Sequence, residues 1–432
     1  MNESRTTAAA APARRRGPLT ALLTAQYLSA FGNAVTIVTV PLYVLGATGS
    51  SIATGLAGFA NALPLIFAGA VGGVFIDRIG GRRMSVLSDL FAGILIGLIP
   101  LLDQTAGLPL PLLMGLLFGR TVVATPAQAA RLSLVKPLAD GAQVRLESAN
   151  SWFQAAPRLG LVAGAPLAGL LIAVSGSVVG MYVDAASFLI ASILVALAVP
   201  PAKAAGGGGE KLSFFRQLTE GFALVRTIPV IGAMTAFVFV TNFLDDAFTP
   251  LMLPVYAKEV LGDGQYLGWL LAASGCGAIA GTFLYPVLSR RFLTSRRYTL
   301  LGCFAVIASL RLLMVLHPGP FLMVAITFVS GLAAGPLNPV LSTVMLERVP
   351  EELRGRVFGL SGAVAMAAAP LGILCAGWAV DGIGLTAALG CFGTAYFVLI
   401  LVSLRSRALR DMDARPTAEA EEQDMEEEPA HG

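Results

Sequence analysis

Long apolar segments, separated by short polar or basic ones, make up most of this chain. Between Gly17 and Ile76 there is no charged residue, and this stretch is long enough for two helices of the roughly 20 residues that cross the hydrocarbon core of a bilayer. A membrane β-barrel would instead show short segments of alternating polarity. The pattern therefore predicts an all-α membrane protein with twelve transmembrane helices. We place the spans at 19–45, 52–76, 84–102, 109–130, 148–174, 178–199, 229–252, 266–288, 298–316, 321–344, 357–380 and 385–404.

An even number of spans puts both ends of the chain on one side of the membrane. The spans form two groups of six, joined by a segment that contains the flexible run Gly206–Gly209. After this run, residues 214–226 carry apolar residues at helical spacing, which predicts a short amphipathic helix on the membrane surface. Beyond Arg410 the chain is polar and acidic, as disordered segments are. The predicted regions are a disordered cytoplasmic tail (1–18), a first six-helix half (19–199), a cytoplasmic linker (200–228), a second six-helix half (229–404) and an acidic disordered tail (405–432).

The two halves repeat one another in sequence. At an offset of 208 residues, 69–75 (GAVGGVF) aligns with 277–283 (GAIAGTF), and the pair Arg82-Arg83 aligns with Arg290-Arg291. At the same offset, three glycines in and after the fifth span align with three in and after the eleventh. They are Gly164, Gly169 and Gly176, aligned with Gly372, Gly377 and Gly384. The same offset at two separated places indicates a duplication, and two homologous halves predict a pseudo-two-fold transporter with its site between them.

Composition and charge support a membrane protein and give its orientation. The chain is 56% hydrophobic and 13% charged, whereas soluble domains are roughly 45–50% apolar and a quarter charged. With the N-terminus in the cytoplasm, the tails and cytoplasmic connections carry 25 of the 29 Lys and Arg, and the external loops carry only Lys258. By the positive-inside rule both termini are cytoplasmic. Because Arg14–Arg16 precede a span too long for a signal peptide, we expect a multi-pass protein of the bacterial cytoplasmic (inner) membrane.

The chain lacks the residues that several classes of chemistry need. The four cysteines all lie inside apolar spans without ligand spacing, so neither a disulfide framework nor a metal site is expected. The chain has no phosphate-binding loop of the kind that ATPases use. No nucleophile–base pair is visible either. We therefore expect no enzymatic activity, no cofactor and no nucleic-acid partner.

The connection after the second span carries a recognisable motif. Residues 73–83 read GVFIDRIGGRR, which resembles the signature loop of the major facilitator superfamily, G-x-x-x-D-R-x-G-x-R-R, at every defined position. In the second half Tyr285 and Pro286 replace its Asp-Arg pair, so only the first half keeps the loop complete. The resemblance implies the major facilitator fold, with spans one, four, seven and ten around the centre. The gating residues that it implies are Gly73, Asp77, Arg78, Gly80, Arg82 and Arg83.

Two further motifs point to proton-coupled drug exporters. Arg120 matches an arginine that many proton-coupled members carry in the fourth span, although Ala124 and Thr125 stand where a glycine is usual. The fifth span resembles the Gly-Pro-x-x-Gly motif of antiporters, and ordinary packing of small residues is the alternative interpretation. Its residues are Gly160, Gly164, Pro166 and Gly169, with Ala165 and Leu170 in place of two glycines. Over its length the chain is similar to the twelve-span drug:proton antiporters, which include macrolide-efflux and enterobactin-export proteins.

Ionisable residues inside hydrocarbon are candidates for function by default. Arg120 and Arg158 each lie ~15 Å into their spans at ~1.5 Å per residue. The resemblance puts spans three, six and nine outside the centre, which favours structural pairing for Asp89, Asp184 and Arg311. For the coupling carboxylate we predict Asp245 or Asp246 in the seventh span, and only one of them can face a cavity because adjacent helical residues point about 100° apart. Uncharged polar candidates for substrate contacts are Gln26, Tyr27, Asn33, Asn242 and Asn338.

The function predicted from these features is secondary active transport. We expect proton-coupled efflux of a small amphipathic or anionic compound, such as an antibiotic, a siderophore or a secondary metabolite. The alternatives are uptake of a small nutrient, or a non-transporting membrane sensor or partner subunit. The expected partners are the small-molecule substrate, protons and the lipid bilayer, and the expected oligomeric state is a monomer.

Overall fold

A computed structural model of the chain describes residues 16–201, 229–289, 295–349, 351–410 and 412–413, with the backbone alone for 67–78, 351–356 and 358. The regular elements among these residues are all helices. Eleven of them are long and apolar enough to cross a membrane, and α2 adds a further apolar helix over 51–66. The predicted all-α membrane fold is confirmed.

The first half consists of six long helices. They are α1 (Arg16–Thr48), α2 (Ser51–Ile79), α3 (Gly81–Ala106), α4 (Leu110–Ala142), α5 (Leu146–Ser175) and α6 (Ser177–Ala198). The second half has more breaks. Its elements are α8 (Pro229–Ala247), η1 (Phe248–Met252), α9 (Leu253–Glu259), α10 (Gln265–Ser289), α11 (Arg296–Met314), α12 (Pro320–Ala334), α13 (Leu337–Arg348), α14 (Glu351–Ile383), α15 (Leu385–Arg405) and α16 (Arg407–Arg410).

Proline explains the two breaks inside predicted spans. The seventh span runs through α8, η1 and α9, and its π-helical turn η1 contains Pro250, with Pro254 just beyond it. Proline lacks a backbone N–H and clashes with the carbonyl of the preceding turn, so the regular ladder cannot continue unchanged. The tenth span is divided at Gly335 and Pro336 into α12 and α13.

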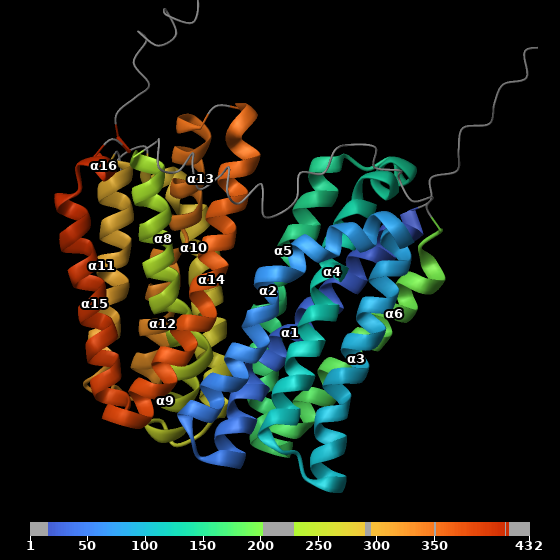
Figure 1. The fold of residues 1–432 in the computed structure, drawn as a ribbon, viewed down its shortest axis with the longest axis horizontal. Coiled ribbons are helices and arrows are strands. Elements are labelled where there is room, and N and C mark those ends of the chain that lie inside the picture. The colour runs from blue at the N-terminus through green and yellow to red at the C-terminus, as the bar shows by residue number, and fades with distance from the viewer. Residues whose placement is uncertain (1–15, 202–228, 290–294, 350, 411, 414–432) are drawn as a thin grey trace, which may run out of the picture.

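The two halves form separate bundles that lie side by side (Figure 1). The helix α1 begins at the end of the molecule where α16 lies, and we call this end the termini side (Figure 1). From this side the two bundles converge towards the other end, which we call the opposite side (Figure 1). The helices α5 and α14 make the main contacts between the halves, against α10 and α2 respectively.

Glycines aligned by the 208-residue offset occupy equivalent positions in the two halves. A Cβ on Gly164 would lie 2.8 Å from the carbonyl oxygen of Phe31 in α1, and one on Gly372 would lie 2.1 Å from that of Phe243 in α8. Both glycines thus bring a helix against the first helix of its own half. Close backbone approach through small residues is a general feature of membrane helix packing.

The second aligned pair of glycines lies between the halves. A Cβ on Gly169 would come within 2.4 Å of the Gln265 carbonyl oxygen in α10, and one on Gly377 within 3.1 Å of the Ser51 carbonyl oxygen in α2. Each glycine therefore brings its helix against the second helix of the other half. The pseudo-two-fold relation inferred from the repeat is reproduced at the level of single contacts.

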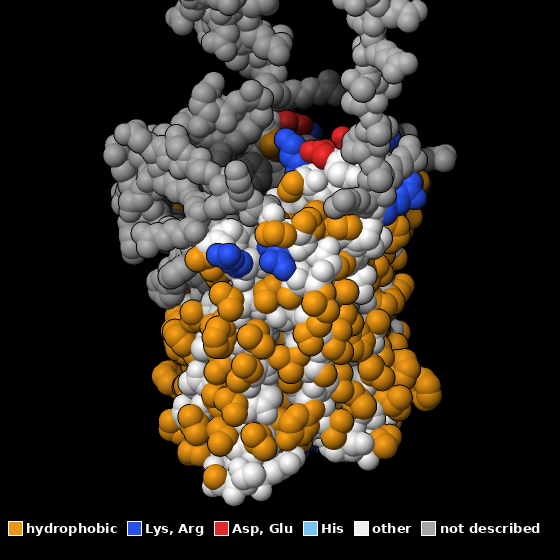
Figure 2. Space-filling model, turned by 90° about the vertical axis from the view of Figure 1, so that its right-hand side faces the viewer, with side chains coloured by type: hydrophobic (Ala, Val, Ile, Leu, Met, Phe, Trp, Pro, Cys, Tyr) orange, Lys and Arg blue, Asp and Glu red, His pale blue; other side chains and the backbone are white. Residues whose placement is uncertain are grey.

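The outer surface is apolar around the bundle. Figure 2 shows a broad face of hydrophobic side chains below a level at which Lys and Arg side chains appear. Large apolar residues point outward at high exposure, among them Phe321 at 91% and Leu197 at 83%. A soluble protein does not leave so large an apolar surface in water. A surrounding bilayer accounts for it.

Two predicted boundaries are wrong. The predicted fourth span ends at residue 130, but α4 continues to Ala142. Residues 405–432 were predicted to be a disordered tail, but Arg407–Arg410 form α16, and Asp413 accepts hydrogen bonds from the Ser295 hydroxyl (2.6 Å) and the Arg296 backbone N–H (2.7 Å). The carboxylate thereby caps the N-terminus of α11. The rest of that tail, residues 1–15 and the predicted surface helix of the linker lie outside the described residues.

Candidate functional site

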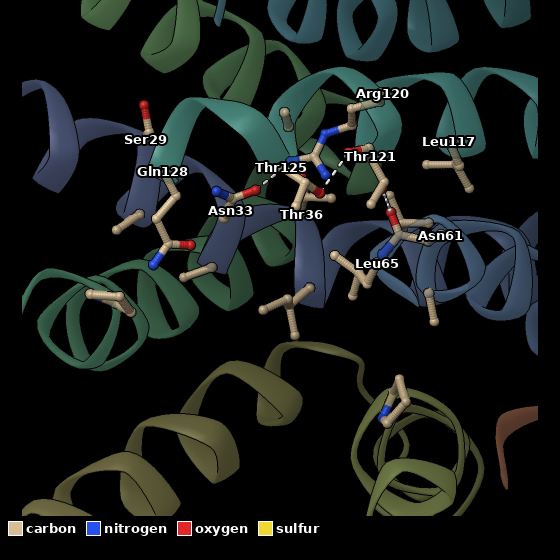
Figure 3. A pocket seen from close by; sticks show the side chains of 18 of the residues that line it. Ser29, Asn33, Thr36, Asn61, Leu65, Leu117, Arg120, Thr121, Thr125 and Gln128 are labelled. Carbon is tan, nitrogen blue, oxygen red and sulfur yellow. Dashed lines mark hydrogen bonds between the residues drawn. The ribbon is translucent and has the colours of Figure 1, made fainter. Parts of the chain in front are cut away.

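A cavity of about 480 Å³ lies mainly within the first half. Its wall is formed mostly by α1, α2 and α4, and Pro250 of η1 and Ile373 of α14 close it from the second half. Figure 3 shows polar side chains on these first-half helices around a common space, with Asn61 beside Thr121 and Asn33 beside Arg120. The cavity therefore combines apolar walls with a few hydrogen-bonding groups, as small-molecule sites do.

Arg120 of α4 is held in place by residues of two other helices, α1 and α6. Its guanidinium donates to the Asn33 amide oxygen on α1 (2.7 Å) and to the Asp184 carboxylate on α6 (2.8 Å). The Asp184 carboxylate also accepts from the Thr36 hydroxyl (2.5 Å). The guanidinium carbon lies 5.3 Å from the centre of the Phe188 ring, within the range of a cation–π interaction. A buried charge needs such a set of partners.

A second buried ion pair, between Arg131 and Asp89, also borders the cavity. The span predicted at 109–130 leaves Arg131 in the cytoplasmic connection that follows it, and this is wrong: only 2% of its surface is exposed, because α4 extends past it. Its guanidinium also donates to Ser85, Gln26 and Ser29. This site was not predicted from the sequence.

The spacing of the residues could have revealed it. Gln26, Ser29 and Asn33 are three and four residues apart and share one face of α1. Arg120, Gln128 and Arg131 likewise share one face of α4, since they are separated by eight and three residues. An apolar span with one polar stripe predicts a wall of a polar cavity.

The cavity has balanced charge. Each of its two arginines is paired with a carboxylate, so the fixed charges cancel within each pair. Of the two arginines predicted at mid-depth, Arg120 has a carboxylate partner, and Arg158 is exposed and does not line the cavity. Neither therefore gives the cavity an excess of positive charge.

The predicted polar residues divide into two groups. Gln26, Asn33 and Arg120 line the cavity. The others lie elsewhere: the Tyr27 hydroxyl donates to the Trp152 carbonyl (2.9 Å), and the Asn242 amide donates to the Ala365 carbonyl (3.3 Å). Asn338 is exposed.

The predicted coupling carboxylates Asp245 and Asp246 do not line this cavity. Asp245 instead forms an ion pair with Arg311 of α11, whose guanidinium lies 4.4 Å from the Phe248 ring centre and 4.9 Å from that of Tyr396. Asp245 therefore belongs to the packing of the second half. Asp246 is half-buried, and no described residue donates a hydrogen bond to it.

The signature loop lies at the end of α2 and the start of α3. Gly80 has φ of 84°, a conformation that glycine adopts without strain, and this supports its predicted role in the turn. Arg82 donates to the Ala196 carbonyl near the C-terminus of α6, where a cation is favourable. Arg83 is exposed. Gly73, Asp77 and Arg78 lie on α2, but their side chains are outside the described residues.

The glycines of the fifth span act in packing. A Cβ on Gly160 would lie 2.8 Å from the Ala30 backbone, one turn along from the contact that Gly164 makes with the same helix. Pro166 lies in α5 between Gly164 and Gly169. Gly169 contacts the other half. The described contacts of this motif are thus contacts between helices.

A bundle of membrane-spanning helices in two related halves, with a cavity in the first half that residues of the second half close, is the architecture of a multi-pass transporter. The model of the Major Facilitator Superfamily matches residues 22–262 and again 235–429. The chain belongs to this superfamily, and within it to the drug-efflux type.

Relatives and solved structures agree with this assignment. The chain is 31% identical to the multidrug efflux pump Tap of Mycolicibacterium fortuitum, over 92% of this chain and 98% of the relative. It is 23% identical to macrolide efflux protein A of Streptococcus pyogenes, over 90% of this chain and 96% of the relative. Among solved structures, the nucleoside transporter NupG shares the fold with a TM-score of 0.71 at 12% identity, covering 90% of this chain and 98% of that one.

Proposed function

We propose that this protein exports small amphipathic compounds from the cytoplasm in exchange for protons. The observation that carries the proposal is the cavity, which lies against the contact between the halves and has apolar walls, amide and hydroxyl groups and balanced charge. Such a surface binds an amphipathic molecule without demanding a fixed charge. The drug-efflux relatives support the direction of transport.

The proposed mechanism is alternating access. Close backbone contacts between the halves, at Gly169 and Gly377, lie on the opposite side of the molecule. The cavity would therefore be loaded from the termini side in this state. Rocking the halves about these contacts would close the termini side and open the opposite side.

We assign the termini side to the cytoplasm and the protein to the bacterial cytoplasmic membrane, as a monomer. The support is the distribution of Lys and Arg, which is heavily biased towards the connections on that side. In the other state, Asp77 at the end of α2 would approach the N-terminus of α14, which also lies on the termini side. A carboxylate is favoured at a helix N-terminus.

Everted membrane vesicles test this function. With an interior made acidic, a proton exchanger accumulates a fluorescent amphipathic dye such as ethidium, and the proton ionophore nigericin abolishes the accumulation. Vesicles without the protein are the control. Accumulation that requires the reversed gradient would instead indicate uptake by cotransport. Absence of dye movement under either gradient, with intact protein in the membrane, would favour the sensor or partner subunit.

A further inference from the structure

The two carboxylates that pair with the cavity arginines are bonded differently. Both oxygens of Asp184 accept hydrogen bonds, one from Thr36 and Arg120 and the other from Ser187. In Asp89, Oδ2 accepts from Arg131, but Oδ1 is buried and has no hydrogen-bond partner among the described residues. Oδ1 can therefore take up a proton without displacing an existing hydrogen bond.

Arg131 can tolerate neutralisation of Asp89. Besides the ion pair, its guanidinium donates to the Ser85 hydroxyl (3.1 Å), the Gln26 amide oxygen (3.0 Å) and the Ser29 hydroxyl (2.9 Å). These three neutral acceptors would hold the guanidinium in place after Asp89 binds a proton. Its positive charge would then have no carboxylate to balance it, because an arginine does not lose its proton.

Few other charged groups lie around Asp89. The helices packed against α3 are α4, α6 and, more weakly, α2. At the level of the cavity α4 presents Arg131 and Arg120, and α6 presents Asp184, which is bonded to Arg120. The neighbouring face of α1 contributes only neutral groups. On α2 the charged residues are Asp77 and Arg78, whose side chains lie outside the described residues.

We propose that Asp89, held by Arg131, is the proton-binding residue of the exchanger, and that an amphipathic cation competes with the proton for the cavity. This inference rests on the proposed exchange function and names its coupling residue and substrate class. With Asp89 ionised the cavity has no net fixed charge, and with Asp89 protonated it has one positive charge. A cation therefore binds better to the deprotonated form, and by linkage its binding expels the proton.

The same charges argue against an anionic substrate. An anion would bind better to the protonated form, so it would be carried together with the proton and not against it. For an exchanger with this cavity, amphipathic weak bases and permanent cations are the matching substrate class. Asp246 is the rival coupling residue, since it is a carboxylate without a described hydrogen-bond partner, but it lies outside the cavity.

Proton release on ligand binding tests the proposal directly. Purified protein in weakly buffered detergent solution, with a pH indicator, receives tetraphenylphosphonium or, as the matched anion, tetraphenylborate. The expected result is proton release by wild type with the cation and none with the anion. Asp89→Asn, which reproduces the charge of the protonated form, should bind the cation more weakly and, at saturating cation, release at least tenfold less proton than wild type. Asp89→Glu should restore release, and Asp246→Asn should behave like wild type.

A second variant keeps the test valid if Asp89→Asn misfolds. If Asp89→Asn does not give a monodisperse protein, Asp89→Asn/Arg131→Gln removes both charges of the pair together and should bind the cation without releasing a proton. Normal release by Asp89→Asn or by Asp89→Asn/Arg131→Gln, loss of release in Asp246→Asn, or release provoked by the anion would each overturn the proposal. The everted-vesicle assay distinguishes failure of the proposed function from failure of the assignment to Asp89. If wild type exchanges dye and Asp89→Asn exchanges it equally well, only the assignment to Asp89 is refuted. Absence of exchange by wild type refutes the proposed function.

Discussion

Asp381, near the end of α14, accepts hydrogen bonds from the backbone N–H of Ile52 (3.0 Å), at the start of α2 in the other half. The same carboxylate accepts from the Ser51 N–H and the Ser50 hydroxyl, each at 2.9 Å. The first N–H groups of a helix have no partner within the helix, and they carry a partial positive charge. Asp381 therefore caps α2 across the boundary between the halves.

A second charge makes the reciprocal contact. The Lys258 ammonium, at the end of α9, donates to the Leu45 carbonyl near the C-terminus of α1 (2.9 Å). A cation thus meets the negative end of one first-half helix, and an anion meets the positive end of the next. Both contacts lie on the opposite side and must break when that side opens.

We predict that Asp381→Ala shifts the protein towards the state that is open on the opposite side. Replacing such a helix cap by alanine costs about 0.5–2 kcal/mol, so the ratio of states should change by about two- to thirtyfold. The measurement is maleimide labelling of Leu42→Cys, introduced in a cysteine-free background, in intact cells. Leu42 is buried and contacts Gly264 of the other half.

Asp263→Ala is the matched control for this prediction. Asp263 is also acidic and near the same side, but among the described residues its carboxylate accepts hydrogen bonds only from Gln265, in its own half. It should leave the labelling rate unchanged. If Leu42→Cys is labelled equally fast with and without the Asp381→Ala substitution, this cap does not hold the halves together.

A second prediction concerns orientation. In the cysteine-free background, Asp263→Cys should react with an impermeant maleimide added to intact cells, and Gly207→Cys should react only after permeabilisation. The reason is the excess of Lys and Arg on the side of the linker. The reverse pattern of labelling would contradict the assignment of the termini to the cytoplasm.

The third prediction concerns the signature loop. Asp77→Asn should lower transport and leave folding intact, because it weakens a contact that forms only when the termini side closes. A carboxylate at a helix N-terminus contributes about 1 kcal/mol, which corresponds to about a fivefold change in the ratio of states. Dye efflux and labelling of termini-side cysteines measure it. Unchanged efflux together with unchanged labelling would remove Asp77 from the gate.

The fourth prediction concerns the stability of the Arg120–Asp184 pair. Replacing either residue alone, as in Arg120→Met or Asp184→Leu, leaves a buried charge without its partner and should cost roughly 3–5 kcal/mol. The double variant should be markedly more stable than the sum of the single losses implies. Thermal unfolding in detergent, followed as a double-mutant cycle, gives the coupling. Additive losses would show that the two charges do not depend on each other.

The sequence predicts the spans and the two-fold relation well, because both depend on local composition and on periodicity along the chain. It fails at Arg131 for a physical reason. A window of about 20 residues ends where the bilayer ends, but α4 has 33 residues and buries Arg131 behind α1 and α3. Hydropathy along one span cannot show what neighbouring helices cover.

The ion pairs between spans could not be predicted from the sequence for a similar reason. Arg120 and Asp184 are 64 residues apart, and nothing in the local sequence joins them. Asp245 or Asp246 was predicted to face the centre because their span lines it, but every such helix also has a side that faces its own bundle. Arg311 lies on that side and binds Asp245.

The glycine contacts between the halves bear on the ease of the rocking motion. At Gly169 and Gly377 one partner contributes no side chain at all, and the other contributes its backbone. The halves can turn against each other there without any side chain having to change rotamer or lose its place in a packed core. Resistance to the motion then comes from the removable polar links and from apolar side chains elsewhere along the boundary, such as Leu42 against Gly264.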